Sequence, residues 1–373
     1  MSDEKKLQLV RKLRAADPGK TRALIGFDGF VDTVVHPVDT RTGPDTYVRI
    51  RTIRDYGEKF LAAAGLSMNI EMVPHESKIG GISAILANSL SLLGLDLTFI
   101  GACGEDALVP VYKEMAGRSK VYSICDPATS DAIEFMDGKV ISSKLEPLKN
   151  ANWEHVCKHI PLDTLVDIYD SADLIGYGGW ALSINVNSIW KGVINEVFPR
   201  MKSTGKKQMF FDLSDPAKRT KEDILEAIDL IRAHRDRFTV GIGFNEKESF
   251  EICELYGKTR NDFSSMREVP EFLREKLGLA YVVVHPVKSA CGCDGETSAE
   301  VQGPFCAEPR LTTGAGDNFN AGFLTARMLG LPLDECLMTG TANSGFYVRN
   351  ARSATYGELC DFMEDWGNGK VTG

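Results

Sequence analysis

The chain has 373 residues, of which 43% are hydrophobic and 25% charged, a composition typical of a globular protein with a large core. Its formal net charge is −9 and it contains no block of Lys or Arg to neutralise a phosphate backbone, which argues against a nucleic-acid partner. We expect a cytoplasmic protein without a membrane partner, because the opening segment is charged, no apolar run approaches the ~20 residues that span a bilayer, and the nine cysteines show no disulfide framework.

Short apolar runs alternate with helical segments along the chain. Residues 23–27 predict a buried strand, and the apolar side chains from Ile82 to Leu93 then fall on one helical face. Residues 97–100 predict the next strand. A loop and a helical stretch follow each of four later runs, which read DLIGYGG, QMFFDLS, FTVGIG and YVVVH. This rhythm predicts a doubly wound α/β fold, in which helices cover both faces of a mainly parallel sheet.

Two stretches interrupt this rhythm. Residues 36–55 are polar, turn-rich and partly alternating, and residues 131–144 form two short strand patterns around an Asp-Gly pair, which is a hairpin signal. We interpret them as a small β flap, inserted as segments 36–55 and 121–147 into a single domain that spans residues 1–373. Surface decoration is the alternative interpretation.

The string LTTGAGDNFNAGF, residues 311–323, carries the most specific chemical signal. Gly314, Ala315 and Gly316 supply small residues where a loop enters a helix, and free backbone N–H groups at such a turn bind anions. Asp317 lies beside them in the first helical turn. A carboxylate there can take a proton from an alcohol while the amides stabilise a moving phosphoryl group. The alternative is that Asp317 only caps the helix.

The string TTGAGDNFNAGF closely resembles the C-terminal motif of the ribokinase-like (PfkB) carbohydrate kinases. The resemblance implies a ribokinase-like fold and an enzyme that transfers the γ-phosphate of ATP to a sugar hydroxyl. It further implies that Asp317 is the catalytic base and that Gly314, Ala315 and Gly316 form the anion hole. MgATP as the phosphate donor and a homodimer formed through the flap are also implied.

Two N-terminal segments match the substrate-binding elements of this family. The stretch ALIGFDGFVDTVV offers Asp28 and Asp32, of which Asp32 fits the family pattern better because a Thr-Val-Val run follows it. A carboxylate accepts two hydroxyl protons at once, which suits a sugar diol. The stretch KIGGISAIL supplies Gly80 and Gly81, which let a substrate approach the backbone closely. A solvated loop aspartate and a plain turn are the alternatives.

Later segments match the metal and nucleotide elements of the family. Asn245 and Glu248 in GIGFNEKES take the place of an Asn-x-x-Glu motif that holds Mg²⁺ through water, and the alternative is a capped helix start. Asn343 in GTANSGFYVRN takes the place of an asparagine near the nucleotide. By the same resemblance, Thr313 and His285 are expected to line the nucleotide site.

The sequence also departs from the family pattern. Ile85 stands where an asparagine often contacts the sugar, and His285 opens a loop where Thr or Ser and Gly are usual. Leu311 replaces an aspartate that helps to bind an activating monovalent cation in many members, so we expect a rate nearly independent of K⁺. These departures leave the acceptor open, with a nucleoside kinase or a sugar sensor without turnover as alternatives.

Rival motifs in the sequence are incomplete. Two near-matches to the Walker A loop lack its first glycine, and G-x-G-x-x-G does not occur. His155, Cys157 and His159 hint at a metal, but they do not provide a complete ligand set in the sequence, so we expect packed or surface side chains. The role of Trp180 stays open at this stage.

Overall fold

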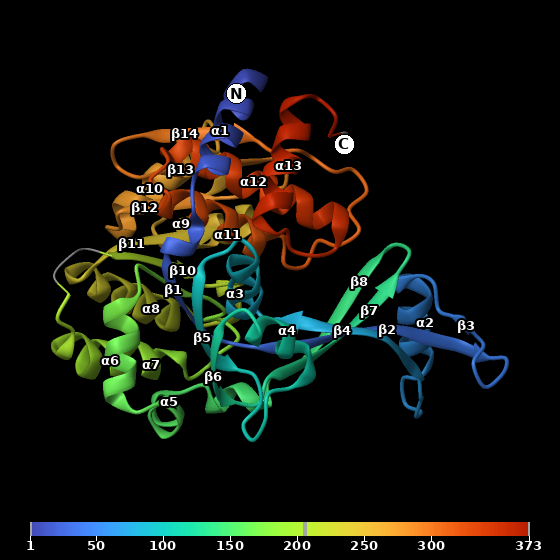
Figure 1. Ribbon diagram of the computed structural model, residues 1–373. Helices are drawn as coiled ribbons and strands as arrows, with labels where there is room; N and C mark the ends of the chain where they lie inside the picture. Colours follow the sequence, from blue (N-terminus) through green and yellow to red (C-terminus); the bar gives the residue numbers. More distant parts are fainter. Residues whose placement is uncertain (1, 204–206, 372–373) are drawn as a thin grey trace.

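A computed structural model describes residues 2–203 and 207–371, and in this part of the chain nine strands form the central sheet (Figure 1). The strands of this sheet are β1 (Arg22–Phe27), β5 (Asp96–Ala102), β6 (Lys120–Cys125), β9 (Leu174–Tyr177), β10 (Lys207–Asp212), β11 (Phe238–Phe244), β12 (Tyr281–Val284), β13 (Ser289–Cys293) and β14 (Ser298–Gln302). Their order is β14-β13-β12-β11-β10-β9-β1-β5-β6. All neighbours from β12 to β6 are parallel, and β13 and β14 add an antiparallel edge.

Helices cover both faces of this sheet, which confirms the predicted doubly wound α/β architecture. Successive side chains of a strand point to opposite faces, so Leu24 and Ile25 of β1 belong to two different hydrophobic cores. The first core is covered by α5 (Trp153–His159), α6 (Leu162–Ser171), α7 (Val186–Gly192), α8 (Lys221–Ala233), α9 (Glu246–Leu255) and α10 (Glu268–Leu277). The second is covered by α1 (Asp3–Ala15), α3 (Ile82–Leu92), α4 (Lys113–Ala116), α11 (Ala315–Met328), α12 (Leu333–Asn350) and α13 (Tyr356–Gly367).

The predicted strands and the first predicted helix lie where the sequence places them. The runs at 23–27 and 97–100 are within β1 and β5, and the four later runs form β9 to β12. Helix α3 ends before Gly94, whose φ of 92° favours glycine. None of the helices in the described part of the chain has the length and apolar character needed to cross a bilayer.

A second sheet projects from the body, as Figure 1 shows on its right side. Its elements are β2 (Phe30–Arg41), β3 (Tyr47–Arg49), β4 (Met72–Gly80), β7 (Ala128–Phe135) and β8 (Gly138–Lys144), together with helix α2 (Ile53–Ala62). We call residues 30–80 and 128–144 the flap. Strand β4 lies outside both predicted flap segments, because its pairing with β2 is long-range and leaves no periodic signal. Strand β6, inside the predicted segment 121–147, belongs to the central sheet.

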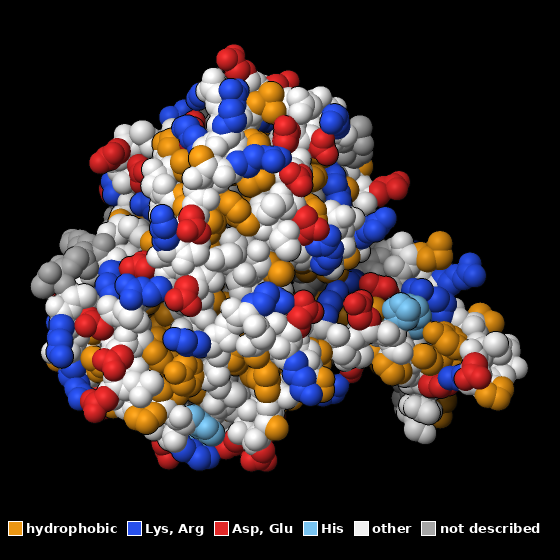
Figure 2. Space-filling view, viewed as in Figure 1, with side chains coloured by type: hydrophobic (Ala, Val, Ile, Leu, Met, Phe, Trp, Pro, Cys, Tyr) orange, Lys and Arg blue, Asp and Glu red, His pale blue; other side chains and the backbone are white. Residues whose placement is uncertain are grey.

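The flap has only a small core of its own. Four buried residues, Val35, Ile50, Ile133 and Phe135, form its centre. Large apolar side chains are exposed on its surface, and Figure 2 shows several hydrophobic patches on this projecting part. They are Val48, Phe60, Leu61, Leu66, Met68, Met136 and Ile141. The flap therefore depends on the body, or on a partner, to cover its apolar surface.

Candidate active site

Polar residues stand at the carboxyl ends of four parallel strands. Asp28 follows β1, Asp212 ends β10, Asn245 follows β11 and His285 follows β12. Because the carboxyl ends of parallel strands meet at one edge of the sheet, this edge is the expected position of a site in such folds. Helix α11 brings Asp317 to the same edge, since the charges of Asp212 and Asp28 both act on its carboxyl group.

The start of α11 exposes backbone donors. Gly314 has a φ of 92°, and a Cβ there would lie 2.7 Å from the hydroxyl oxygen of Tyr347, so both conformation and space favour glycine. The N–H of Ala315 already donates to the carbonyl of Thr312 at 3.0 Å. In the described part of the chain, the N–H groups of Gly314, Gly316 and Asp317 have no backbone or side-chain acceptor, so these amides are available to an anion.

Asp317 is buried beside these donors and is only 5% exposed. Burial raises the pKa of its carboxyl well above the ordinary value, and the negative charges of Asp212, Asp28 and Glu248 raise it further. A general base works best when its pKa approaches the operating pH, and this surrounding moves Asp317 in that direction. The structure thus places the predicted base in the first turn of α11, in an environment that increases its affinity for a proton.

The two N-terminal aspartates have different surroundings. Asp28 is fully buried, and its carboxylate accepts hydrogen bonds from the N–H groups of Ile82 at 2.9 Å and Ser83 at 2.8 Å. Burial raises its pKa to about 7, against the effect of these hydrogen bonds. Asp28 therefore holds the start of α3, and its carboxylate, predicted to bind substrate, has no exposed surface.

Asp32 lies on β2 of the flap and is only partly buried. Burial raises the pKa of its carboxyl, whereas a hydrogen bond with Ser130 and the nearby charge of Lys78 lower it. A Cβ on Gly80 would lie 2.3 Å from this carboxylate, so the glycine makes room for the aspartate. The charge of Asp32 also raises the pKa of Asp317, although less than the charges of Asp212, Asp28 and Glu248 do.

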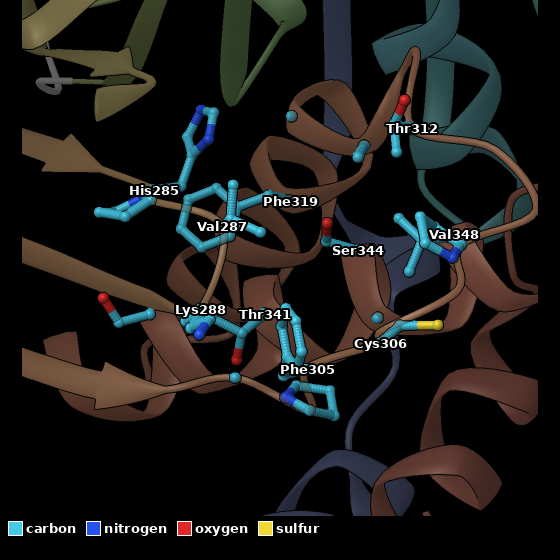
Figure 3. Close-up of a pocket in the computed structure, with 18 of the residues that line it drawn as sticks. His285, Val287, Lys288, Phe305, Cys306, Thr312, Phe319, Thr341, Ser344 and Val348 are labelled. Atoms are coloured by element: carbon cyan, nitrogen blue, oxygen red, sulfur yellow. The ribbon is translucent and has the colours of Figure 1, made fainter. Parts of the chain in front are cut away.

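A pocket of about 320 Å³ lies beside the first turn of α11 (Figure 3). The loop after β12, the segment before α11 and the helix α12 form its walls, through residues that include His285, Lys288, Phe305, Thr312, Thr341 and Ser344. Burial lowers the pKa of His285 to about 4, so its ring is neutral at pH 7, and its Nε2 atom has no hydrogen-bond partner among the described residues. Its ring approaches Gly316, where a Cβ would lie 3.0 Å from Cε1.

Two residues expected at the nucleotide lie one position away from the pocket wall. Asn343 is fully buried and donates to the carbonyl of Asn318 at 2.7 Å and to Ser89 Oγ at 3.2 Å, so it joins helices inside the core. The carbonyl of Thr313 accepts a hydrogen bond from Tyr347 at 2.7 Å. Their neighbours Ser344 and Thr312 line the pocket instead, because successive residues of a helix or tight turn face different directions.

Asn245 and Glu248 form a reciprocal cap at the start of α9. The N–H of Glu248 donates to Asn245 Oδ1 and the N–H of Asn245 donates to Glu248 Oε2, both at 2.9 Å. Glu248 also belongs to the acidic group at the sheet edge, since burial and the charge of Asp212 raise its pKa. The helix-cap interpretation and the acidic-site interpretation are therefore compatible.

The acidic group fits a hard cation. Burial raises the pKa of Asp212, Glu248 and Asp317 alike, so a cation would relieve a real electrostatic cost. Within residues 2–203 and 207–371, no three of these acids come close enough to ligate one ion directly. Mg²⁺ keeps part of its water shell and is usually held by one or two carboxylates together with phosphates, so this loose arrangement suits it.

Sequence reasoning missed Asp212 and left Trp180 open. Asp212 accepts a hydrogen bond from Asn320 at 2.8 Å, and its signal was present, because it ends the apolar run QMFFDLS of a predicted parallel strand. Trp180 is fully buried, donates to Asn187 Oδ1 at 2.8 Å and packs under the guanidinium of Arg219. It is a packing residue.

The chain resembles known sugar kinases along most of its length. A sequence model described as prokaryotic ketohexokinase matches residues 3–366. The ketohexokinase of Haloferax volcanii is 28% identical over 347 residues, which cover 92% of this chain and 91% of that protein.

Two solved structures show the shared fold. Ribokinase from Thermotoga maritima superposes with a TM-score of 0.61 at 18% identity, covering 92% of this chain and 99% of that one. A phosphofructokinase-2 variant from Escherichia coli gives a TM-score of 0.64 at 13% identity, covering 93% and 99%. The predicted ribokinase-like fold is confirmed.

Proposed function

Because the chain belongs to the prokaryotic ketohexokinase family and is an ATP-dependent sugar kinase, we propose that its acceptor is a ketohexose. The observation that carries the catalytic part of this proposal is the position of Asp317, buried beside free amides at the start of α11. The family supports a ketohexose over a nucleoside. A sensor without turnover would not need a base of raised pKa beside an anion site.

In the proposed reaction, Asp317 accepts the proton of an acceptor hydroxyl as that oxygen attacks the γ-phosphorus of ATP. The oxygen–phosphorus bond to the acceptor forms, the bond from the γ-phosphorus to the bridging oxygen breaks, and ADP leaves. The N–H groups of Gly314, Gly316 and Asp317 stabilise the charge on the transferring group, and Gly314 also allows the turn that presents them. Ala315 contributes its small side chain, because its N–H is bonded within the turn.

We assign acceptor binding to the flap side of the site. Asp32 has the exposure to accept hydrogen bonds from two sugar hydroxyls. Gly80 makes room for its carboxylate, and Gly81, whose φ is 90°, allows the turn into α3 against Phe30 and Asp28. The charge of Asp32 is among those that raise the pKa of Asp317, which supports a sugar that contacts both carboxylates. Ile85 and Tyr347, which both border Gly314, shape the neighbouring apolar wall.

We assign the nucleotide to the pocket of about 320 Å³. Its apolar and aromatic lining suits a purine base, and Thr312 and Ser344 offer hydroxyl groups. His285 lies between this pocket and Gly316, so its unpartnered ring nitrogen can bond a phosphate oxygen if the tautomer places the proton there. Neutral histidine fits this role without adding charge.

Asp212 and the Asn245–Glu248 pair are the residues that would hold Mg²⁺, through water. When bound, Mg²⁺ supplies positive charge between the phosphate oxygens and the carboxylates. The chain itself provides the hydrogen bonds that fix these ligands: Asn320 orients Asp212, and the reciprocal cap orients Glu248.

The test is a substrate panel assayed by ADP release. Purified protein with MgATP is given ketohexoses, aldohexoses, ribose and adenosine in separate reactions, and the phosphorylated product is identified by NMR. We expect a kcat/KM for at least one ketohexose that exceeds the values for the aldoses and adenosine by tenfold or more. A preference for adenosine or for an aldose would overturn the acceptor assignment, and binding without ADP release would overturn the catalytic one.

We also propose that two copies associate through the flap. The support is the concentration of exposed apolar side chains there, of which Leu61 is 78% and Met136 74% exposed. Sedimentation of the wild type and of Leu61→Glu tests this assembly, with Ile184→Glu as the matched control because Ile184 is an exposed apolar residue of the body. A dimer that survives Leu61→Glu and dissociates with Ile184→Glu would place the interface on the body.

A further inference from the structure

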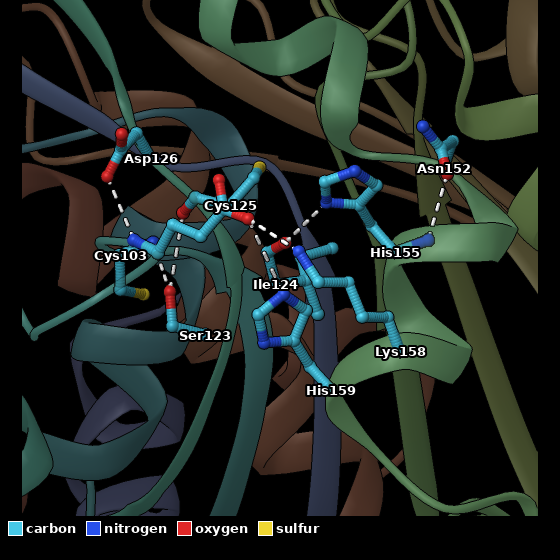
Figure 4. A network of polar contacts seen from close by, with 10 residues as sticks. Cys103, Ser123, Ile124, Cys125, Asp126, Asn152, His155, Lys158 and His159 are labelled. Atoms are coloured by element: carbon cyan, nitrogen blue, oxygen red, sulfur yellow. Dashed lines mark hydrogen bonds and ion pairs between the residues drawn. The ribbon is translucent and has the colours of Figure 1, made fainter.

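Three side chains with metal-binding groups meet outside the candidate active site. Glu105 lies in the loop after β5, and His155 and His159 are one helical turn apart on α5. One potential ligand atom from each residue lies within 4.8 Å of the other two, and this is the only such group of three among the described residues. Figure 4 shows both imidazole rings projecting from α5 towards β6.

The ring of His155 contacts a backbone carbonyl. Its Nδ1 atom lies 3.2 Å from the carbonyl oxygen of Ile124. A carbonyl oxygen only accepts, so this contact places the proton on Nδ1 while no ion is bound. Nδ1 is also the nitrogen on the side of Glu105 and His159 (Figure 4), so an ion that binds there would displace this proton and leave the ring protonated on Nε2.

The ring of His159 lacks a hydrogen-bond partner at one nitrogen. Its Nε2 atom is buried and has no hydrogen-bond partner in the described part of the chain. The nearest carboxylate oxygen is Glu105 Oε1, at 4.0 Å, which is too long for a hydrogen bond. Two ligands of a tetrahedral Zn²⁺ ion with bonds near 2.0–2.1 Å lie about 3.3 Å apart, so an ion between these atoms requires them to approach by well under 1 Å.

Two further residues of α5 could affect metal binding, Lys158 as a competitor for Glu105 and Cys157 as an additional ligand. Lys158 forms an ion pair with Glu105 Oε1 at 2.9 Å, but its side chain is 58% exposed, and such surface pairs are weak. This Oε1 atom is the oxygen that faces His159, so an ion would have to share it with Lys158 or displace the ammonium group. Cys157 lies two positions from each histidine, faces away from them and is exposed, so it is not a ligand.

We propose that Glu105, His155 and His159 bind one Zn²⁺ ion, with water completing a tetrahedral shell. Two imidazoles and a carboxylate are a ligand set that Zn²⁺ favours over Mg²⁺. The ion joins α5 to the root of the flap, because the N–H of Glu105 donates to Asp126 Oδ1 at 2.8 Å in the short link between β6 and β7. The role is structural: it fastens the connection through which β7 leaves the body.

The first experiment measures Zn²⁺ affinity by competition with a chromophoric chelator. Metal-stripped full-length protein is titrated in millimolar Mg²⁺, which occupies the hard-oxygen site. We expect one equivalent of tightly bound Zn²⁺ in the wild type, and affinity at least tenfold weaker in His155→Ala and in His159→Gln. Cys157→Ser and His75→Gln are the controls, since His75 stacks on His36 in the other histidine pair of the described chain.

The second experiment removes the competing ammonium group of Lys158 and measures thermal stability. Lys158→Ala frees Glu105 and should tighten Zn²⁺ binding severalfold. Zn²⁺ should raise the Tm of the wild type by several degrees and leave the Tm of His159→Gln nearly unchanged. The proposal is overturned if both histidine variants keep the tight equivalent, if His75→Gln removes it, or if the wild type binds no Zn²⁺ in competition with the chelator.

Discussion

The carboxyl edge of the central sheet and the flap meet at the candidate active site, and they are built in opposite ways. At the sheet edge, Asp28, Asp212 and Asp317 are all less than 10% exposed, and large hydrophobic cores lie on both faces of the sheet. The flap has a core of four buried residues, and its acidic ligand Asp32 faces the cationic Lys78. Buried carboxylates have strongly raised pKa values, whereas a partly exposed one beside a cation remains a hydrogen-bond acceptor.

This difference separates chemistry from recognition. The body holds groups whose proton affinity must be controlled, and only a packed, low-dielectric surrounding shifts a pKa far enough. The flap carries the residues to which we assign sugar binding, and a thin sheet with little core can change its surface residues without disturbing a large core. We therefore expect substitutions in the body to change kcat, and substitutions in the flap to change KM.

The largest effect is expected for Asp317→Asn. Loss of the base should lower kcat by ~10²–10⁴-fold, the usual contribution of a positioned general base, while nucleotide binding and the fold persist. Steady-state kinetics on the preferred sugar and a fluorescent-nucleotide titration measure the two quantities. A variant that keeps more than half of the wild-type kcat would show that Asp317 is not the base.

Asp32→Asn tests the flap side. Loss of a charged acceptor should raise KM for the sugar by about 10–100-fold, from the ~1.5–3 kcal/mol of a hydrogen bond to a charged group. The effect on kcat should be smaller. Asp131→Asn is the matched control, because Asp131 lies on the neighbouring strand β7 and pairs with exposed Lys144. Equal losses of kcat in Asp32→Asn and Asp317→Asn would contradict the division between flap and body.

Glu248→Gln tests the metal side of the body. This substitution keeps the shape of the cap and removes the negative charge. We expect a severalfold increase in the Mg²⁺ concentration that gives half-maximal rate, with an unchanged KM for the sugar. Rate measurements across a Mg²⁺ titration provide both values. An unaltered Mg²⁺ dependence would leave Glu248 as a helix cap alone.

The buried acids also predict a pH effect on stability. A carboxyl group whose folded pKa is raised stabilises the fold below its unfolded pKa, near 4, and loses this contribution as pH rises through its folded pKa. For Asp28 the folded value is about 7, and the pKa of Asp317 is also raised. In EDTA and without nucleotide, Asp317→Asn should thus melt a few degrees above the wild type at pH 8, and the gap should narrow at pH 5. A difference in Tm between the variant and the wild type that is larger at pH 5 than at pH 8 would contradict this prediction.

The smallest effect is expected for K⁺. Leu311 is buried and offers no carboxylate, and the guanidinium of Arg349 donates to the carbonyls of Pro304 and Phe305 in the segment before it. The positively charged guanidinium group of Arg349 therefore already occupies these carbonyl oxygens. KCl titrated against tetramethylammonium chloride at constant ionic strength should change the rate by less than twofold. Severalfold activation specific to K⁺ would show that Leu311 does not abolish the cation site.

The sequence was most informative where local pattern and chemistry coincide. The strands β1, β5 and β9 to β12 are continuous apolar runs, and the small residues before Asp317 mark a turn into a helix whatever the rest of the chain does. Both features depend on neighbours in sequence, so they were predicted.

Long-range placement was not predictable from the same evidence. The pairing of β4 with β2 joins residues that are 50 positions apart at Phe30 and Gly80 and 35 apart at Pro37 and Met72, and β4 carries no apolar alternation to reveal it. Asn343 lies one helical position from the pocket, and a motif match does not resolve a turn of about 100°. Glu105 comes close to His155 and His159 only in the tertiary fold. The sequence therefore did not show it as a third potential ligand beside the two histidines.

The chain order of the flap has a consequence for synthesis on the ribosome. Its last strand, β8, is complete at Lys144, while Asp317 follows roughly 170 residues later. At about 5–20 residues per second, this interval lasts roughly 10–35 s. During this time the recognition half of the site, with its exposed apolar side chains, emerges before the catalytic half exists. Nascent flaps on neighbouring ribosomes therefore have time to meet, so we expect subunit association to begin before translation ends.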